Sequence, residues 1–186
     1  KSLKSDGVVA YPTDTVYGLG ANAFSSQGID RIFQIKGRPR NMAMPLLIAN
    51  KEELSRVAIN IPKIVNTIVE HFWPGALTII LEKSPEVSDM ISRESTVAVR
   101  LPNHPVPIAL INGLGSPITG TSANLSSEPA VTTSDDVRKT LGHKLDCIID
   151  EGPRPYGVES TILDLTTPSP RIVREGAITK QAIEKV

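Results

Sequence analysis

The sequence has little of what would place it outside the ordinary globular proteins. Its 186 residues include one cysteine, Cys147, so no intrachain disulfide can form. The two isoleucines that follow Cys147 predict a small buried side chain there and not a nucleophile. No apolar run approaches the roughly 20 residues that cross a bilayer, and no signal core precedes residue 10. We therefore expect a protein that does not bind a membrane, and nothing in the sequence indicates secretion.

Net charge, aromatic residues and metal ligands are scarce as well. Twenty basic residues balance twenty acidic ones, which gives no support for non-specific binding of RNA, although a local basic patch stays open. Aromatic residues make up 4% of the chain, too few to favour a platform for stacking bases. The three histidines are scattered without zinc spacing, so we expect no resident metal. A P-loop is excluded because no Gly-Lys-Ser/Thr ending is present.

What is present is an alternation of short strands and helices. Periodicity and turn residues predict strands over residues 8–11, 46–48, 77–81, 97–100, 118–119, 147–150, 161–165 and 171–173. Helices are expected from 29 to 36, 61 to 72, 105 onward, 133 to 141 and 179 onward. Without a repeat or a linker, the pattern predicts one α/β domain over residues 1–186. Its sheet should be mixed, since only a Pro-rich turn separates the last two strands.

Four polar clusters interrupt this framework, and each lies where an element ends. They are residues 12–20 (PTDTVYGLG), 36–40 (KGRPR), 119–124 (TGTSAN) and 157–161 (GVEST). Small hydroxyls and glycines at strand ends allow close approach to a ligand, and three cations within five residues can neutralise a polyphosphate. Ordinary turns and a solvated cationic surface explain the same residues equally simply. The residues alone thus predict a basic, hydroxyl-rich anion site without identifying a reaction.

Taken in order, these clusters and three further stretches resemble the YrdC/TsaC family of threonylcarbamoyl-AMP synthases. The matching stretches are residues 12–20, 36–39, 73–78 (WPGALT), 96–102 (TVAVRLP), 121–124, 157–162 and 174–176 (REG). Each stretch is modest by itself, but seven in register over nearly the whole chain are highly specific. The resemblance implies a single α/β domain with a twisted mixed parallel and antiparallel sheet and flanking helices around a basic concave cavity.

The resemblance also implies a reaction: L-threonine, bicarbonate and ATP would give threonylcarbamoyl-AMP and pyrophosphate, the first step of N6-threonylcarbamoyladenosine formation in tRNA. Magnesium would accompany ATP. A tRNA-modifying transferase complex in the cytoplasm would use the product, with direct RNA contact left open. The implied roles are polyphosphate binding and catalysis by Lys36 and Arg38, nucleotide binding by these two with Thr96, Ser122, Asn124 and Arg174, and L-threonine binding by Thr15, Arg100, Gly120 and Ser160.

The chain departs from the family pattern at several points. Many relatives place a threonine-contacting histidine where Ala49 stands, and some place a serine at the position of Ala130. The segment after Arg38 is longer than in many relatives, and the C-terminal domain of longer members is not expected here. The chain begins without methionine, so we expect it to derive from a longer product.

Two alternatives remain open at this stage. One is a carbamoyl-transfer paralogue of the same fold, such as the domain found in hydrogenase maturation proteins. The other is a double-stranded RNA-binding module, which depends on the local cations Lys36, Arg38 and Arg40.

Overall fold

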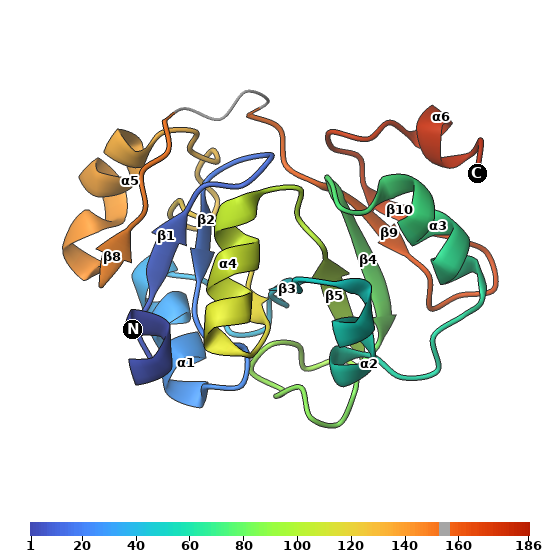
Figure 1. Ribbon diagram of the computed structural model, residues 1–186, viewed down its shortest axis with the longest axis horizontal. Coiled ribbons are helices and arrows are strands. Elements are labelled where there is room, and N and C mark those ends of the chain that lie inside the picture. The colour runs from blue at the N-terminus through green and yellow to red at the C-terminus, as the bar shows by residue number, and fades with distance from the viewer. Residues whose placement is uncertain (153–156) are drawn as a thin grey trace.

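The computed structural model describes residues 1–152 and 157–186, and its strands form two sheets (Figure 1). The smaller sheet has the order β7-β2-β1-β8 and the larger has the order β10-β9-β4-β5-β3-β6. The strands of the smaller sheet are β1 (Val9–Tyr11), β2 (Gly18–Gly20), β7 (Thr121–Ser122) and β8 (Cys147–Ile148). Those of the larger sheet are β3 (Leu46–Leu47), β4 (Leu77–Glu82), β5 (Thr96–Arg100), β6 (Ile118–Thr119), β9 (Thr161–Asp164) and β10 (Arg171–Arg174).

Both sheets mix strand directions, as the sequence predicts, although the expectation of one sheet is corrected to two. In the smaller sheet β1 runs antiparallel to β2 and parallel to β8. In the larger sheet β4 pairs with β5 in antiparallel fashion and with β9 in parallel fashion. The sheets meet where β6 and β7 are separated only by Gly120, so one short segment belongs to both.

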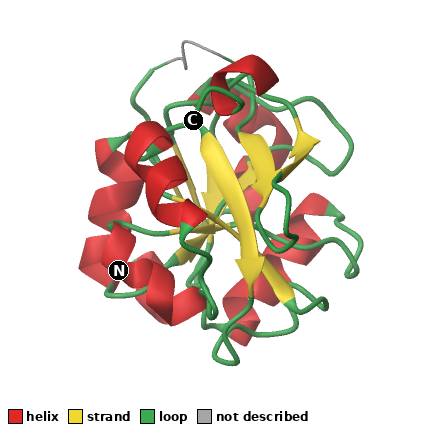
Figure 2. Ribbon diagram, turned by 90° about the vertical axis from the view of Figure 1, so that its right-hand side faces the viewer, coloured by secondary structure: helices red, strands yellow, loops and turns green. Residues whose placement is uncertain are grey.

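Helices lie on both sides of the strands (Figure 2). They are α1 (Ser26–Lys36), α2 (Leu54–Val57), α3 (Ile64–Phe72), α4 (Pro105–Leu114), α5 (Ser134–Leu141) and α6 (Lys180–Ile183), with 3-10 turns η1 (Ser2–Ser5), η2 (Lys51–Glu53) and η3 (Gly142–Lys144). The expected helix ends are confirmed where local capping fixes them. Gly37 ends α1 in the left-handed conformation, and Thr133 caps α5 by accepting from the Asp136 amide. None of the described helices is long and apolar enough to span a membrane.

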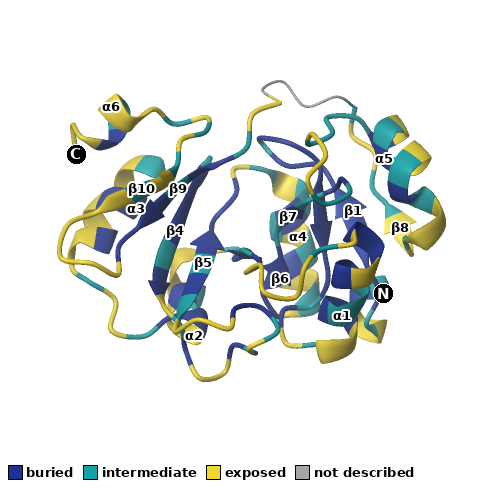
Figure 3. Ribbon diagram, turned by 180° about the vertical axis from the view of Figure 1, so that it is seen from behind, coloured by how far each residue is buried: buried dark blue, intermediate teal, exposed yellow. Residues whose placement is uncertain are grey.

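The apolar core follows the strands, while the outer faces of the helices are exposed (Figure 3). A smaller second core gathers Tyr11 and Leu47 against Ile111 of α4. The prediction for Cys147 is wrong, because its side chain is exposed at the start of β8. That strand is two residues long and lies at the edge of its sheet, so an apolar neighbourhood in sequence does not bury it.

Two glycines in β2 are required by the ring of Tyr11. A Cβ atom on Gly18 or Gly20 would approach the Tyr11 ring carbons to 2.7 Å, closer than side chains pack. The Tyr11 hydroxyl donates to the carbonyl of Thr119 at 2.9 Å, so the ring links β1 to the segment shared by both sheets. Residues 12–20, expected to form a loop, therefore contain a strand whose glycines make room for one aromatic side chain.

Candidate functional site

A cavity of about 260 Å³ opens where the ends of the two sheets meet, and it collects most of the predicted site residues. Its described lining includes three guanidinium groups, from Arg38, Arg100 and Arg174. It also includes Thr15, Gly120, Ser122 and Ser160 from the predicted set. These residues come from six separate stretches of the chain, so their meeting is a result of the fold and not of sequence proximity.

Arg100 ends β5 and is buried, with 7% of its surface exposed. Its Nε donates to the carbonyl of Gly75 at 2.9 Å and its Nη1 donates to Thr15 Oγ1 at 3.0 Å. Its Nη2 donates to the Asp14 carboxylate at 2.5 Å. A guanidinium carries five N–H groups, so among the described residues one N–H on each terminal nitrogen has no partner. These two are the donors left for an incoming carboxylate.

The hydroxyl groups around Arg100 are themselves held in place. Thr15 Oγ1 lies 3.0 Å from Thr13 Oγ1, and Thr13 in turn donates to the Val16 carbonyl at 2.7 Å. Ser160 Oγ lies 2.8 Å from Thr78 Oγ1 across β4 and β9. Both Thr15 and Ser160 are buried, so their hydroxyls have fixed directions and suit recognition of a small polar ligand.

Gly120 lines the cavity through its backbone. Its N–H donates to the carbonyl of Pro45 at 2.8 Å, and a side chain at this position would meet Leu47 at 2.6 Å. The glycine therefore lets the segment between β6 and β7 lie directly against β3. At the Ala49 position, the backbone amide donates to Glu53 Oε2 at 2.8 Å.

Arg38 and Arg174 both bring positive charge to the cavity. Nη2 of Arg38 donates to the carbonyl of Ala43 at 2.6 Å, which folds the longer segment after Arg38 around its guanidinium. Burial lowers the pKa of Arg38, and the negative charge of Glu159 acts in the opposite direction. Arg174 lies on β10 after a register shift in its pairing with β9. Such a bulge redirects side chains, and here the Arg174 guanidinium reaches the cavity.

Lys36 does not lie among the described lining residues, although its motif neighbour Arg38 does. It is 2% exposed, and its Nζ donates to the carbonyls of Ser122 and Asn124 at 2.5 and 2.6 Å. Burial, and then the charge of Arg38, lower the pKa of Lys36 to about 8. The ammonium thus ties the end of α1 to the segment that carries the predicted nucleotide contacts.

Asn124 is also buried behind the cavity surface. Its Nδ2 donates to the carbonyls of Leu125 and Glu128, at 2.8 and 2.7 Å. Its Oδ1 is buried and has no hydrogen-bond partner among the described residues. Asn124 is not among the described lining residues of the cavity, and its side chain instead holds the backbone of residues 125 and 128 in place.

Thr96 is the one predicted site residue that the structure separates from the others. It begins β5 whereas Arg100 ends it, so the two lie about 13 Å apart along an extended strand. Thr96 lines a different cavity, beside Asn60 and Thr166. The geometry gives no support to a nucleotide contact at Thr96.

The cations of residues 36–40 do not form one surface. Lys36 is buried, and Arg40 pairs with Asp30 and lies over the ring of Phe33, 5.1 Å from its centroid. The RNA-binding alternative depended on these cations acting together, and the structure gives it no support.

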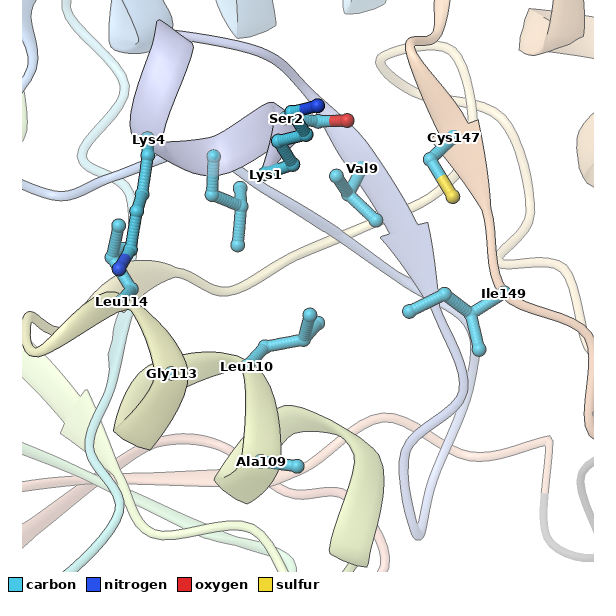
Figure 4. A pocket seen from close by; sticks show the side chains of 11 residues that line it. Lys1, Ser2, Lys4, Val9, Ala109, Leu110, Gly113, Leu114, Cys147 and Ile149 are labelled. Carbon is cyan, nitrogen blue, oxygen red and sulfur yellow. The ribbon is translucent and has the colours of Figure 1, made fainter.

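A second cavity, of about 210 Å³, lies between η1, α4 and β8 (Figure 4). Leu110 and Ile149 border it together with Val9, while Lys1 and Lys4 lie at its edge. Its described lining holds no arginine and no hydrogen-bonded hydroxyl array comparable to that around Arg100. Groups of three or more metal-ligating side chains are absent from the described residues. The arginine-lined cavity is therefore the candidate site.

Comparison with known proteins agrees with this fold. The family model described as "Telomere recombination", which covers the Sua5, YciO and YrdC proteins, matches residues 1–176. The threonylcarbamoyl-AMP synthase of Pyrococcus abyssi is 42% identical over 99% of this chain, and that of Bacillus subtilis is 41% identical over 99%. The crystal structure of P. abyssi Sua5 complexed with L-threonine superimposes with a TM-score of 0.97 at 41% identity, over 99% of this chain and 54% of that one. The chain thus spans about half the length of these relatives, 54% of each. It belongs to the Sua5/YciO/YrdC family.

Proposed function

We propose that this chain carries the catalytic domain of a threonylcarbamoyl-AMP synthase, a nucleotidyltransferase. It would join L-threonine, bicarbonate and ATP into threonylcarbamoyl-AMP with release of pyrophosphate. The relatives at 41–42% identity bear this name, which favours it over the carbamoyl-transfer paralogue. The observation that carries the proposal is the buried Arg100, which keeps two terminal N–H groups for a carboxylate beside the fixed hydroxyls of Thr15 and Ser160.

The amino-acid end of the site would be formed by Arg100 with its hydroxyl neighbours. L-Threonine brings a carboxylate, and a guanidinium with two parallel N–H groups binds a carboxylate in one orientation. The hydroxyl oxygens of Thr15 and Ser160 would accept from the ammonium group of the ligand or hydrogen-bond with its hydroxyl group. Gly120 would let the ligand approach the backbone because no side chain intervenes.

The nucleotide end would be formed by Arg38 and Arg174 together with Ser122, and the buried side chain of Asn124 would support this segment from behind. Two guanidiniums facing one cavity suit a polyphosphate, whose charge they would neutralise during transfer. Lys36 would add a further positive charge from behind the segment that holds Ser122. Magnesium would enter as part of the MgATP substrate, since the described residues hold no cluster of metal ligands.

The chemistry needs no nucleophile from the protein. The amine of L-threonine would add to the carbon of carbon dioxide with loss of a proton to solvent, or to that of bicarbonate with loss of water, and give N-carboxy-threonine. An oxygen of the new carboxylate would then form a bond to the α-phosphorus of ATP, and the bond from that phosphorus to the β-bridging oxygen would break as pyrophosphate leaves. The protein would position the two reactants and stabilise developing negative charge. This accounts for a site rich in cations and hydroxyls without a catalytic dyad.

The proposed product, threonylcarbamoyl-AMP, would be used by other proteins. A mixed anhydride such as threonylcarbamoyl-AMP is reactive, so a transferase complex that acts on tRNA would consume it. A cytoplasmic location, where ATP and tRNA meet, is part of this proposal.

The test is pyrophosphate release from the purified chain with ATP, magnesium, L-threonine and bicarbonate, together with mass spectrometry of the nucleotide product. Omission of each component in turn should abolish release. Replacing L-threonine by L-valine, which has the same shape without the hydroxyl, is the matched substrate control and should give little product. Equal release of pyrophosphate without L-threonine would contradict the proposal.

A further inference from the structure

Glu159 brings a negative charge into a cavity whose other described charged lining groups are all arginines. Sequence reasoning gives this residue no role. Its carboxylate lies close enough to raise the pKa values of Lys36 and Arg38 against the effect of burial. Glu159 is thus placed where an anionic ligand would meet the same cations.

The carboxylate of Glu159 contacts Arg174 through one hydrogen bond. Nη1 of Arg174 donates to Glu159 Oε2 at 2.5 Å, and both side chains are 40% exposed. Nε and Nη2 of Arg174 both donate to the carbonyl of Ser160, at 3.3 and 2.9 Å. The Ser160 carbonyl therefore holds the guanidinium in place whether or not the Glu159 carboxylate is present.

The backbones of the two partners are fixed relative to each other. The Ala177 amide donates to the Glu159 carbonyl at 3.0 Å. A Cβ atom on Gly176 would lie 2.3 Å from that same carbonyl oxygen, so only glycine allows this approach. A change of partner at Nη1 thus requires rotation of the Glu159 side chain alone, and no movement of the strands.

We infer that Glu159 is a resident counter-anion of the site, which occupies Nη1 of Arg174 until a phosphate group of a polyphosphate ligand displaces it. The inference deepens the proposed function, on which it rests, by assigning a residue that limits polyphosphate affinity. An ion pair this exposed is weak, because water and salt compete with it. The displaced carboxylate can be hydrated at the open side of the cavity, so the exchange is easily reversed.

The inference predicts the size of a change in polyphosphate affinity. Removing the competing carboxylate should tighten binding of a polyphosphate about two- to fivefold, which is the range expected for one exposed ion pair. The gain should require Arg174, because without that guanidinium there is no shared donor to compete for. A simple reduction of negative charge would instead help binding whether or not Arg174 is present.

Calorimetric titration with inorganic tripolyphosphate decides between these outcomes. The variants are Glu159→Gln, Arg174→Met and the double substitution. Asp135→Asn serves as the matched control, because it removes one carboxylate from an exposed pair with Arg138 on α5. We expect tighter binding for Glu159→Gln, weaker binding for Arg174→Met, no gain from Glu159→Gln in the Arg174→Met background, and parent affinity for Asp135→Asn.

Three results would overturn the inference: no tripolyphosphate binding by the parent, an unchanged or lower affinity for Glu159→Gln, or equal gains in both backgrounds. The assay is separate from synthase activity. Tripolyphosphate binding with the expected pattern, but no threonine-dependent pyrophosphate release, would keep the exchange and reject the proposed reaction. Threonine-dependent pyrophosphate release without the expected changes in tripolyphosphate affinity would keep the proposed reaction and reject the exchange.

Discussion

Replacing Arg100 by lysine tests the proposed amino-acid end of the site most directly, because the change keeps the positive charge. The guanidinium donates to Gly75, Thr15 and Asp14 from three different nitrogens. A lysine ammonium is one point at the end of a flexible stem and cannot reach partners placed around a planar fork. We expect it to follow the charge of Asp14 and to lose the other two hydrogen bonds.

The expected loss of stability follows from those two bonds. Each net hydrogen bond contributes about 0.5–1.5 kcal/mol, so Arg100→Lys should lower the free energy of unfolding by about 1–3 kcal/mol. A domain of ordinary stability stays folded after such a loss. The two remaining terminal N–H groups, which the proposed function assigns to the ligand carboxylate, are lost as well. L-Threonine affinity should therefore fall about 5- to 150-fold, corresponding to about 1–3 kcal/mol for a charged contact.

The assay is calorimetric titration of the variant with L-threonine and with ATP separately, together with urea unfolding. ATP affinity should stay near that of the parent. Arg171→Lys is the matched control, since Arg171 is a 71% exposed arginine on β10 outside the cavity. It should change neither affinity. L-Threonine affinity equal to that of the parent in a folded Arg100→Lys variant would refute the reasoning, as would an equal loss for both ligands.

Three further predictions follow from other contacts. Lys36 has a pKa of about 8 in the folded chain, below its unfolded value, so the cost of its buried charge disappears as pH rises above 8. Urea unfolding should show the parent gaining about 1 kcal/mol relative to Lys36→Met between about pH 7 and pH 9, and parallel pH profiles would contradict this. Thr96→Val should leave the KM for ATP within about twofold of the parent in the pyrophosphate assay, because Thr96 faces another cavity. Gly176→Ala should destabilise the chain by about 1–3 kcal/mol in thermal unfolding, because its methyl group would overlap the Glu159 carbonyl, whereas Gly113→Ala, with open space around the added carbon, should not.

The parts of the fold that the sequence predicts are those that local chemistry determines. Thr133 and Asp136 are three residues apart and form the expected cap, because the contact lies within one helical turn. The strands over Leu77–Glu82 and Thr96–Arg100 are rich in β-branched residues and are found where predicted. Strands β2 and β7 escape prediction, since glycine and serine carry little strand preference. Their pairing depends on Tyr11 and on neighbours distant in sequence.

The sequence predicts which residues belong to the candidate site better than it predicts how they are arranged in space. The motif containing Lys36 and Arg38 suggests two equivalent cations, yet only Arg38 lines the cavity. The two are separated because α1 ends between them and turns Lys36 inward toward the carbonyls of residues 122 and 124. Thr96 and Arg100 share one motif, but an extended strand separates its two ends. No sequence pattern indicates the proposed role of Glu159, because that role depends on Arg174. Arg174 is 15 positions away, and a bulge redirects its side chain.

The irregular pairing between β9 and β10 also bears on how the protein behaves at high concentration. β10 forms one edge of the larger sheet, and a regular edge strand invites pairing with another molecule. The register shift between Ile172 and Arg174 breaks the row of free backbone groups, and a charged side chain stands at each end of the strand. The opposite edge is covered within the molecule, because Ile118 of β6 bridges to Asn22. The distortion that turns Arg174 toward the cavity therefore also makes this edge a poor template for aggregation.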